Sequence, residues 1–336
     1  MSSFSLDCAE KFLDKVYEDL KSSQALFREN ISSTAIYHLH QANEKMYKAI
    51  RCLLDYLFVS IPLGLTRIFH KCIQFSDEKE ENMFVRIEKI LNQKELRDPK
   101  QLDELFKRIY SHNVAEGFFK EIDDIRKSYE GTAKYIVNSI RHEMPNFSLF
   151  IEGIFKIIED QLFQRSKNAI DQYLSNSQTA DIGIICVMYA TEYLLIKDDT
   201  IEKLVEILKE HGIPSSNEKE RIKKAWKFIF TIFIILIINI YLNKLGDLRY
   251  PDFTSTESQN TLYNEIKSNF NILLNISLRN YYRVRTALNI LRNIEQNIQA
   301  YQCDQKISYD EFKTQLENAT VDTIQNILRA NLQLME

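Results

Sequence analysis

The sequence is poor in the two residues that turn a polypeptide chain most readily. It has 7 glycines and 5 prolines among 336 residues, about 4% of the chain, whereas an average protein has roughly 12%. β-Sandwiches and barrels need such residues at frequent turns, and phosphate-binding loops need closely spaced glycines. No G-x-G-x-x-G, Walker-A or G-x-S-x-G pattern occurs. The shortage predicts an all-α protein, a bundle of long helices joined by short loops.

Cysteine is also scarce, and its spacing follows no binding pattern. The 5 cysteines lie far apart, and no two form a C-x-x-C pair. This spacing argues against a zinc ribbon and against a disulfide framework. His38 and His40 stand two residues apart on a predicted helix, so they face different directions and make a poor metal pair. We therefore expect neither a metal nor a cofactor.

The sequence also has no excess of basic residues. The 43 lysines and arginines are outnumbered by 47 acidic residues, and the net charge is −4. Without a global basic field, contact with RNA would depend on a local group of cations. The first residues, MSSFSLDCAEKF, show neither the basic nor the apolar region of a secretory signal. We expect a cytoplasmic protein.

One long hydrophobic run stands out, at residues 228–242, FIFTIFIILIINIYL. Several lysines and an arginine precede it, which is typical of the cytoplasmic side of a membrane anchor. A span needs roughly 20 apolar residues, however, and this run is shorter and contains Asn239, which is costly in lipid. The run therefore favours a buried helix of the bundle, with membrane contact as the weaker alternative.

Apolar residues at intervals of three and four predict amphipathic helices along the rest of the chain. The first covers residues 4–28, and its apolar stripe is Leu6, Ala9, Leu13, Val16 and Leu20. The second starts at about residue 34, after a serine N-cap, and ends near residue 59 before Pro62 and Gly64. Later helix starts are predicted at Ser76, at Asp98 and at the Ser308–Glu311 capping box. We predict about ten helices and no strand, in two units at residues 1–145 and 146–336 or in one intertwined domain.

The second predicted helix carries the most informative pattern. Residues 41–49 read QANEKMYKA. Four polar residues share one helix face, namely Gln41, Glu44, Lys45 and Lys48, while small and apolar residues occupy the other. One interpretation is a solvated face with a Glu44–Lys48 ion pair. The other is that the two lysines neutralise a phosphate.

This string resembles the Q-A-x-E-K-x-x-K-A signature of HEPN domains. The stretch from Pro62 to His70 is similar to the family's proline-then-histidine segment, and residues 248–253, LRYPDF, resemble the R-Y-P-D element that precedes the last HEPN helix. The two motifs lie farther apart here than in the usual domain. The resemblance therefore implies an HEPN-like helical bundle with a large helical insertion, or two diverged HEPN-like units.

The resemblance also implies a function. HEPN proteins are often dimeric, and many bind nucleotides or act on RNA in toxin–antitoxin or antiviral defence systems, with an antitoxin or a nucleotidyltransferase as a partner. It places nucleotide or phosphate binding at Glu44, Lys45, Lys48, His70 and Arg249. A structural role for these residues at helix contacts is the alternative, and it corresponds to a non-enzymatic dimerisation or interaction module. A membrane-associated effector that uses residues 228–242 is a third reading.

Whether the chain is an enzyme stays open. Ribonucleases of the family use an Arg-x4–6-His motif for metal-independent cleavage, and the sequence lacks it around all 6 histidines. The nearest approach is Arg108 and His112, which share a helix face at i, i+4 and are the candidate catalytic pair. An ordinary exposed pair is the alternative.

A second group of cations suggests RNA binding. Arg279, Arg283 and Arg285 are interleaved with Tyr281 and Tyr282. Arginine and tyrosine together suit single-stranded RNA, because bases stack on aromatic rings while guanidinium groups contact phosphates. The alternative is a solvated or bundle-packing helix.

Overall fold

The computed structural model describes residues 3–107, 127, 130–145, 148, 152, 257–301, 303 and 306–318. Within these residues 87% of the chain is helical and 2% is strand, which confirms the all-α prediction for this part. The elements are α1 (Phe4–Arg28), α2 (Ser32–Asp55), a π-helix η1 (Tyr56–Ser60), α3 (Ile61–Cys72), β1 (Ile73–Gln74), α4 (Glu78–Lys94), α5 (Pro99–Lys107), α12 (Glu257–Ala300), β2 (Ile307–Ser308) and α13 (Tyr309–Asn318).

Helix α1 has the bounds and the buried stripe that its periodicity predicts. All five stripe residues, from Leu6 to Leu20, are at most 1% exposed. Full burial of a leucine or valine contributes about 1.5–3 kcal/mol, so this stripe is a major part of the core. The chain then reverses at Asn30, which has a positive φ of 60°, and α2 begins at Ser32 after Ile31. The predicted serine N-cap is wrong, since Ile31 occupies that position and supplies no side-chain hydrogen bond.

Pro62 and Gly64 do not end the second helix, and this prediction was wrong too. Helical backbone continues from Ser32 to Cys72, because the π-turn η1 separates α2 from α3 without breaking the helical path. Pro62 lies in the first turn of α3, where its missing N–H costs little. The packing of Val59 and Leu63 into one hydrophobic core keeps the chain helical across the junction.

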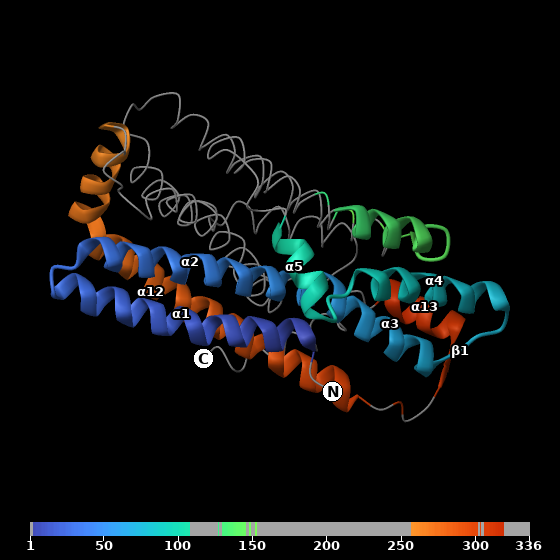
Figure 1. Cartoon of the computed structure of the whole chain (residues 1–336). Helices are drawn as coiled ribbons and strands as arrows, with labels where there is room; N and C mark the ends of the chain where they lie inside the picture. Colours follow the sequence, from blue (N-terminus) through green and yellow to red (C-terminus); the bar gives the residue numbers. More distant parts are fainter. Residues whose placement is uncertain are drawn as a thin grey trace.

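Helix α12 packs along both α1 and α2, as Figure 1 shows. Phe270 stacks on Phe27 of α1 with ring centroids 3.9 Å apart. Ser277 of α12 and Asn43 of α2, both buried, exchange hydrogen bonds of 3.0 and 3.1 Å. Helices from the two predicted units therefore share one core within the described residues, while the division of the whole chain into units stays a prediction.

A second core fills the end of the molecule that holds α3, α4 and α13. It also includes residues from the helical stretch 130–140 and from β1. Its members are Val59, Leu63, Ile73, Met83, Phe84, Ile87, Leu91, Ile140, Met144, Tyr309 and Phe312. Strands β1 and β2 pair in parallel here, with Ile73 opposite Ile307. These strands contradict the expectation of none, because two-residue strands have no periodicity to detect.

Side-chain caps begin several helices near the predicted positions. The Asp77 carboxylate accepts from the backbone N–H groups of Lys79 and Glu80, so Asp77 rather than Ser76 is the N-cap of α4. Asp98 accepts from the N–H of Gln101 at 2.9 Å. At α13, the Ser308 hydroxyl accepts from the N–H of Glu311 at 3.2 Å. The caps predicted at Asp98 and Ser308 are thereby confirmed.

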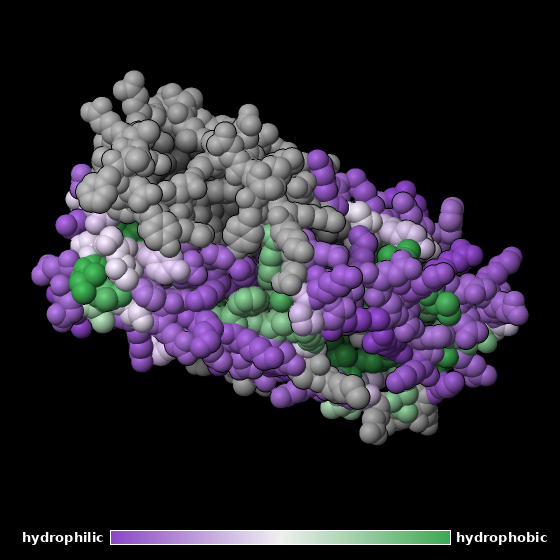
Figure 2. Space-filling model, in the orientation of Figure 1, coloured by the Kyte–Doolittle hydropathy of each residue, from purple (hydrophilic) through white to green (hydrophobic). Residues whose placement is uncertain are grey.

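The visible face is mostly hydrophilic over α1 and over the end with α3 and α4 (Figure 2). Among the described residues, the helical path Ser32–Cys72 is long and apolar enough to span a membrane by length and composition, and 44% of its most apolar window is buried. Core helices meet the same criteria, and this one packs against α1 and α12. The apolar run at residues 228–242 lies outside the described residues.

Candidate functional site

The inner face of the signature helix is part of the core. Ala42, Met46 and Ala49 are fully buried against the neighbouring helices. Asn43, between them, is 1% exposed and donates to the carbonyl of Leu39 as well as bonding to Ser277. The small residues of the signature therefore allow close helix packing, and Asn43 fixes the register of α12 against α2.

The outer face of the same helix carries internal ion pairs. Lys48 donates to Glu44 at 2.8 Å, which confirms the predicted pair. Lys45 pairs with Asp19 of α1, and His38 lies 3.2 Å from the other oxygen of that carboxylate. Both lysines are about one-quarter exposed. A phosphate at this face would have to compete with Asp19 and Glu44, so the geometry favours the structural reading of these residues.

The other predicted phosphate-binding residues do not join this face. His70 lies on α3, where its two ring nitrogens are 3.3 Å from Glu81 and 3.9 Å from Glu88. Arg249 and the candidate catalytic pair Arg108 and His112 lie outside the described residues. The structure therefore brings together Glu44, Lys45 and Lys48 but not His70.

The predicted RNA-binding residues lie on α12 and split into two kinds. Arg285 pairs with Glu10 and Asp14 of α1 at 3.3 and 3.0 Å. Tyr281 is buried and stacks on Tyr17 of α1, with ring centroids 5.4 Å apart, and this burial raises the pKa of the Tyr281 phenol. Arg279 is exposed, and so is Tyr282, at 59%. Tyr281 and Arg285 therefore face α1 and contact it, whereas Arg279 and Tyr282 face outward.

A cleft of about 690 Å³ opens where the start of α1, η1, α3, the loop after α4 and the end of α12 meet. Its lining includes three cations, namely Arg67 and Lys71 of α3 and Arg97 before α5. The apolar part includes Ile68 and Ile298, and two tyrosines, Tyr56 and Tyr301, also line it. Burial raises the pKa of the Tyr56 phenol above its ordinary value, so this group stays a neutral hydrogen-bonding group.

The two arginines of the cleft are held by one amide. Asn92 of α4 accepts through its side-chain oxygen from Arg67 at 2.7 Å and also from Arg97. Arg67 further pairs with Glu88 at 3.1 Å, and Arg97 with Glu95 at 2.9 Å. Lys71 is exposed and makes no ion pair with any described residue. The cleft thus combines two guanidinium groups, each paired with a carboxylate, and the ammonium group of Lys71. Its lining also includes the carboxylates of Glu95 and Glu295.

One wall of the cleft depends on a glycine. A Cβ at Gly64 of α3 would lie 2.9 Å from Cγ2 of Ile298 on α12, closer than carbon atoms pack. Glycine therefore allows α3 and α12 to approach each other at the cleft. Asp55 precedes the lining residue Tyr56 in the chain. It is 6% exposed and accepts a hydrogen bond from the Ser5 hydroxyl at 2.6 Å.

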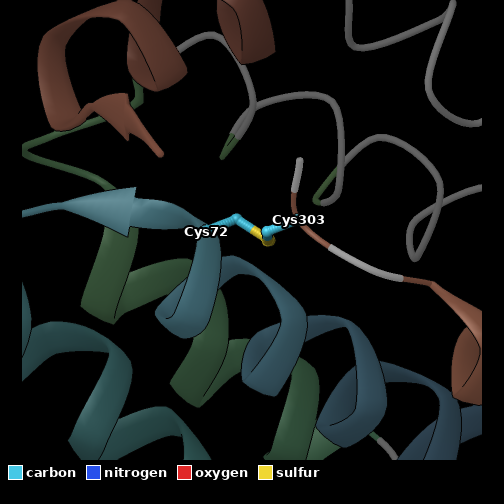
Figure 3. Close-up of a disulfide and its surroundings, with 2 residues drawn as sticks. All are labelled: Cys72 and Cys303. Carbon is cyan, nitrogen blue, oxygen red and sulfur yellow. A yellow bond between two sulfur atoms is a disulfide. The ribbon is translucent and has the colours of Figure 1, made fainter. Parts of the chain in front are cut away.

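A disulfide joins Cys72 to Cys303 (Figure 3), and both residues line the cleft. Cys72 ends α3, and Cys303 lies on the connection between α12 and β2. The Cα atoms are 5.6 Å apart, an ordinary separation for a disulfide. The cysteine spacing argues against a disulfide framework, and this pair corrects that expectation. Because 231 residues separate the two cysteines, no local spacing could reveal the bond.

Sequence reasoning passed over the cleft, although part of it had a signal. Arg67 and Lys71 are four residues apart and so share one face of a helix, but the predicted helix end before Pro62 left them outside the predicted helix. No group of three or more histidine, cysteine, aspartate or glutamate residues suited to a metal occurs within the described ranges. Comparisons with protein-family models, with curated proteins and with solved structures each found no match.

Proposed function

We propose that this chain is an HEPN-like helical protein that binds a phosphate-bearing ligand, a nucleotide or an RNA phosphate, in the cleft beside α3. The observation that carries this proposal is the position of Arg67, Lys71 and Arg97 at one nucleotide-sized cleft. This cleft directly follows the signature helix in the chain, through the continuous helical path from Ser32 to Cys72.

The chemistry of the cleft suits such a ligand. Small-molecule sites typically enclose about 300–1,000 Å³, and the cleft has about 690 Å³. Guanidinium groups bind phosphate oxygens in a bidentate manner, and an ammonium group adds a point charge. Tyr301, which is 60% exposed, and the apolar side chains beside it provide surface on which a base could stack. We place the phosphate at the cleft because Lys71 is exposed there, whereas Lys45 and Lys48 are each held by a carboxylate.

The biological setting follows from the HEPN resemblance, which rests on the sequence motifs. The proposal includes a homodimeric, cytoplasmic protein of a toxin–antitoxin or antiviral defence system, with an antitoxin or nucleotidyltransferase as a partner. If the protein is an enzyme, we propose that it is a metal-independent ribonuclease that uses Arg108 and His112. Incubation of the purified protein with total RNA and EDTA tests the ribonuclease activity. Cleavage by this pair would persist in EDTA and vanish in His112→Ala.

A titration with ATP tests the cleft. We expect ATP to raise the thermal midpoint of the full chain and to give a measurable dissociation constant by calorimetry. Lys71→Glu should weaken ATP binding about tenfold or more, since a charge-assisted contact contributes roughly 1.5–3 kcal/mol. Lys89→Glu is the matched control, because Lys89 is an exposed lysine of α4 outside the cleft. Equal loss in both variants, or no ATP binding at all, would contradict the proposal.

The non-enzymatic interaction module is the second candidate, and the ion pairs of the signature helix favour it. Lys45 and Lys48 are each bound to a carboxylate of the same chain, so the signature supports packing rather than ligand contact. A protein that binds neither ATP nor RNA, yet forms a defined dimer by light scattering, would support this candidate over the first.

A further inference from the structure

We propose that Cys72–Cys303 is a thiol–disulfide exchange site and that its reduction weakens the binding of phosphate-bearing ligands in the adjoining cleft. The second half of this proposal rests on the function proposed above, whereas the first half is independent of it. The starting observation is that both cysteines line the cleft together with Lys71 and Tyr301.

The bond is open to attack from solvent. Cys303 is exposed, and Cys72 is partly exposed at the end of α3. A thiolate of an external dithiol can therefore attack the sulfur of Cys303, which breaks the bond to Cys72 and releases the Cys72 thiolate. Cations stabilise a departing thiolate, and Lys71 is its neighbour in the chain and in the cleft.

The exchange is complete in two steps. The first step leaves a mixed disulfide between Cys303 and the dithiol. The second thiol of the reductant then displaces Cys303 and closes the reductant's own disulfide. Two electrons pass from the dithiol to the cysteine pair, and both released thiolates take up protons according to their pKa values. The required co-reactant is any dithiol reductant.

The contacts around the disulfide limit what its loss can move. On one side α12 is packed against α1 and α2. On the other, β2 pairs with β1, and Tyr309 and Phe312 of α13 are buried in the second core. We therefore expect reduction to leave α12 and α13 in place and to free Tyr301 and Cys303, which line one side of the cleft.

Two effects then weaken anion binding in the same direction. A freed wall must be ordered again when a ligand binds, which costs affinity. Any fraction of Cys72 that stays a thiolate next to Lys71 also places negative charge in the cleft. Ordering of one side chain such as Tyr301 corresponds to about a twofold to tenfold change in the dissociation constant, and we expect a loss in that range.

Amide hydrogen exchange and ATP calorimetry on the oxidised and the dithiothreitol-reduced full chain test the proposal. We expect faster exchange in peptides that cover residues 301–306, unchanged exchange in α13, and weaker ATP binding after reduction. Cys303→Ser should reproduce the reduced state without reductant. Cys8→Ser is the control, since Cys8 is a free cysteine that does not line the cleft.

The two halves of the proposal and the proposed function fail in different ways. Complete reduction is verified by alkylation and mass measurement. If amide hydrogen exchange at residues 301–306 is then unchanged, the proposal that the disulfide holds this part of the chain is overturned. Equal ATP affinity of both forms overturns the regulation alone. Absence of ATP binding in both forms overturns the proposed function, while the exchange data still decide whether the disulfide holds the wall.

Discussion

Arg67 and Arg97 donate hydrogen bonds to the same side-chain oxygen of Asn92. One neutral acceptor thus holds two positive charges together at the cleft, and each of them also has a carboxylate partner, Glu88 and Glu95 respectively. A phosphate beside the two guanidinium groups would accept charge-assisted hydrogen bonds from both. Asn92 is therefore a positioning residue for the proposed anion site.

Substitution of Asn92 tests this arrangement. In Asn92→Ala the guanidinium groups lose their common acceptor, and we expect ATP affinity to fall about threefold to tenfold, in line with the loss of one ordinary hydrogen bond per arginine. Asn92→Asp should lower ATP affinity further, because its carboxylate neutralises the arginines that would bind the phosphate. Calorimetry at constant ionic strength measures both. Wild-type affinity in Asn92→Asp would contradict the role of these arginines.

The close approach of α3 to α12 predicts that even alanine at Gly64 lowers the free energy of unfolding. Gly64→Ala would place a methyl group 2.9 Å from Ile298, and overpacking of this kind costs about 1–3 kcal/mol. Gly131→Ala is the matched control, because Gly131 also lies in a helix and no atom lies within 4 Å of its added Cβ. Alanine there should stabilise the protein by about 0.5–1 kcal/mol, as in other exposed helices. Urea denaturation of the two variants measures these opposite signs.

The main helices could be predicted because their signals are local. The apolar stripe from Leu6 to Leu20 recurs at helical intervals, and the polar residues after Arg28 mark its end, so both bounds of α1 follow from the chain itself. Pro62 misled the prediction, since a proline in the first turn of a helix is tolerated and the buried neighbours Val59 and Leu63 keep the backbone helical.

The candidate site was less predictable because its parts come from distant segments. The pairing of Lys45 with Asp19 joins two helices, and nothing in the spacing of either one indicates it. The cleft needs the end of α12 against α3, and its disulfide joins residues 231 positions apart. Such contacts follow from tertiary packing, whereas the Glu44–Lys48 pair, at i, i+4, was within reach of sequence reasoning.

Arginine substitutions on α12 separate packing from RNA binding. Arg285→Ala removes the pairs with Glu10 and Asp14. Since these groups are partly exposed, the free energy of unfolding should drop by at most about 1 kcal/mol. Arg279→Ala should weaken the binding of a single-stranded oligouridine at low salt, if the exposed face of α12 contacts RNA. Fluorescence anisotropy at two salt concentrations measures the change, and equal oligouridine affinity in Arg279→Ala and wild type would remove Arg279 from the proposed RNA surface.

The buried carboxyl of Asp55 predicts a distinctive dependence of stability on pH. Burial raises its pKa from 3.8 to about 6, and the hydrogen bonds from Ser5 and from the backbone of Leu96 offset this only in part. The folded protein therefore binds a proton that the unfolded chain releases near its ordinary pKa. The contribution of Asp55 to stability is complete below about pH 4 and is lost as the pH rises through about 6.

Asp55→Asn should remove this dependence, because the amide is neutral at every pH and its oxygen can still accept from Ser5. A pKa raised by about two units corresponds to roughly 3 kcal/mol between the two protonation states, so we expect the variant to be more stable than wild type at pH 8 by up to that amount and similar to it near pH 4. Denaturant unfolding at both pH values measures the difference, with Asp310→Asn, an exposed residue of α13, as the control. Equal loss of stability at pH 4 and pH 8 in Asp55→Asn would contradict the raised pKa. It would show that neighbouring groups stabilise the ionised carboxylate in the folded protein. The Arg51 guanidinium, one helical turn away, would then be the next group to substitute.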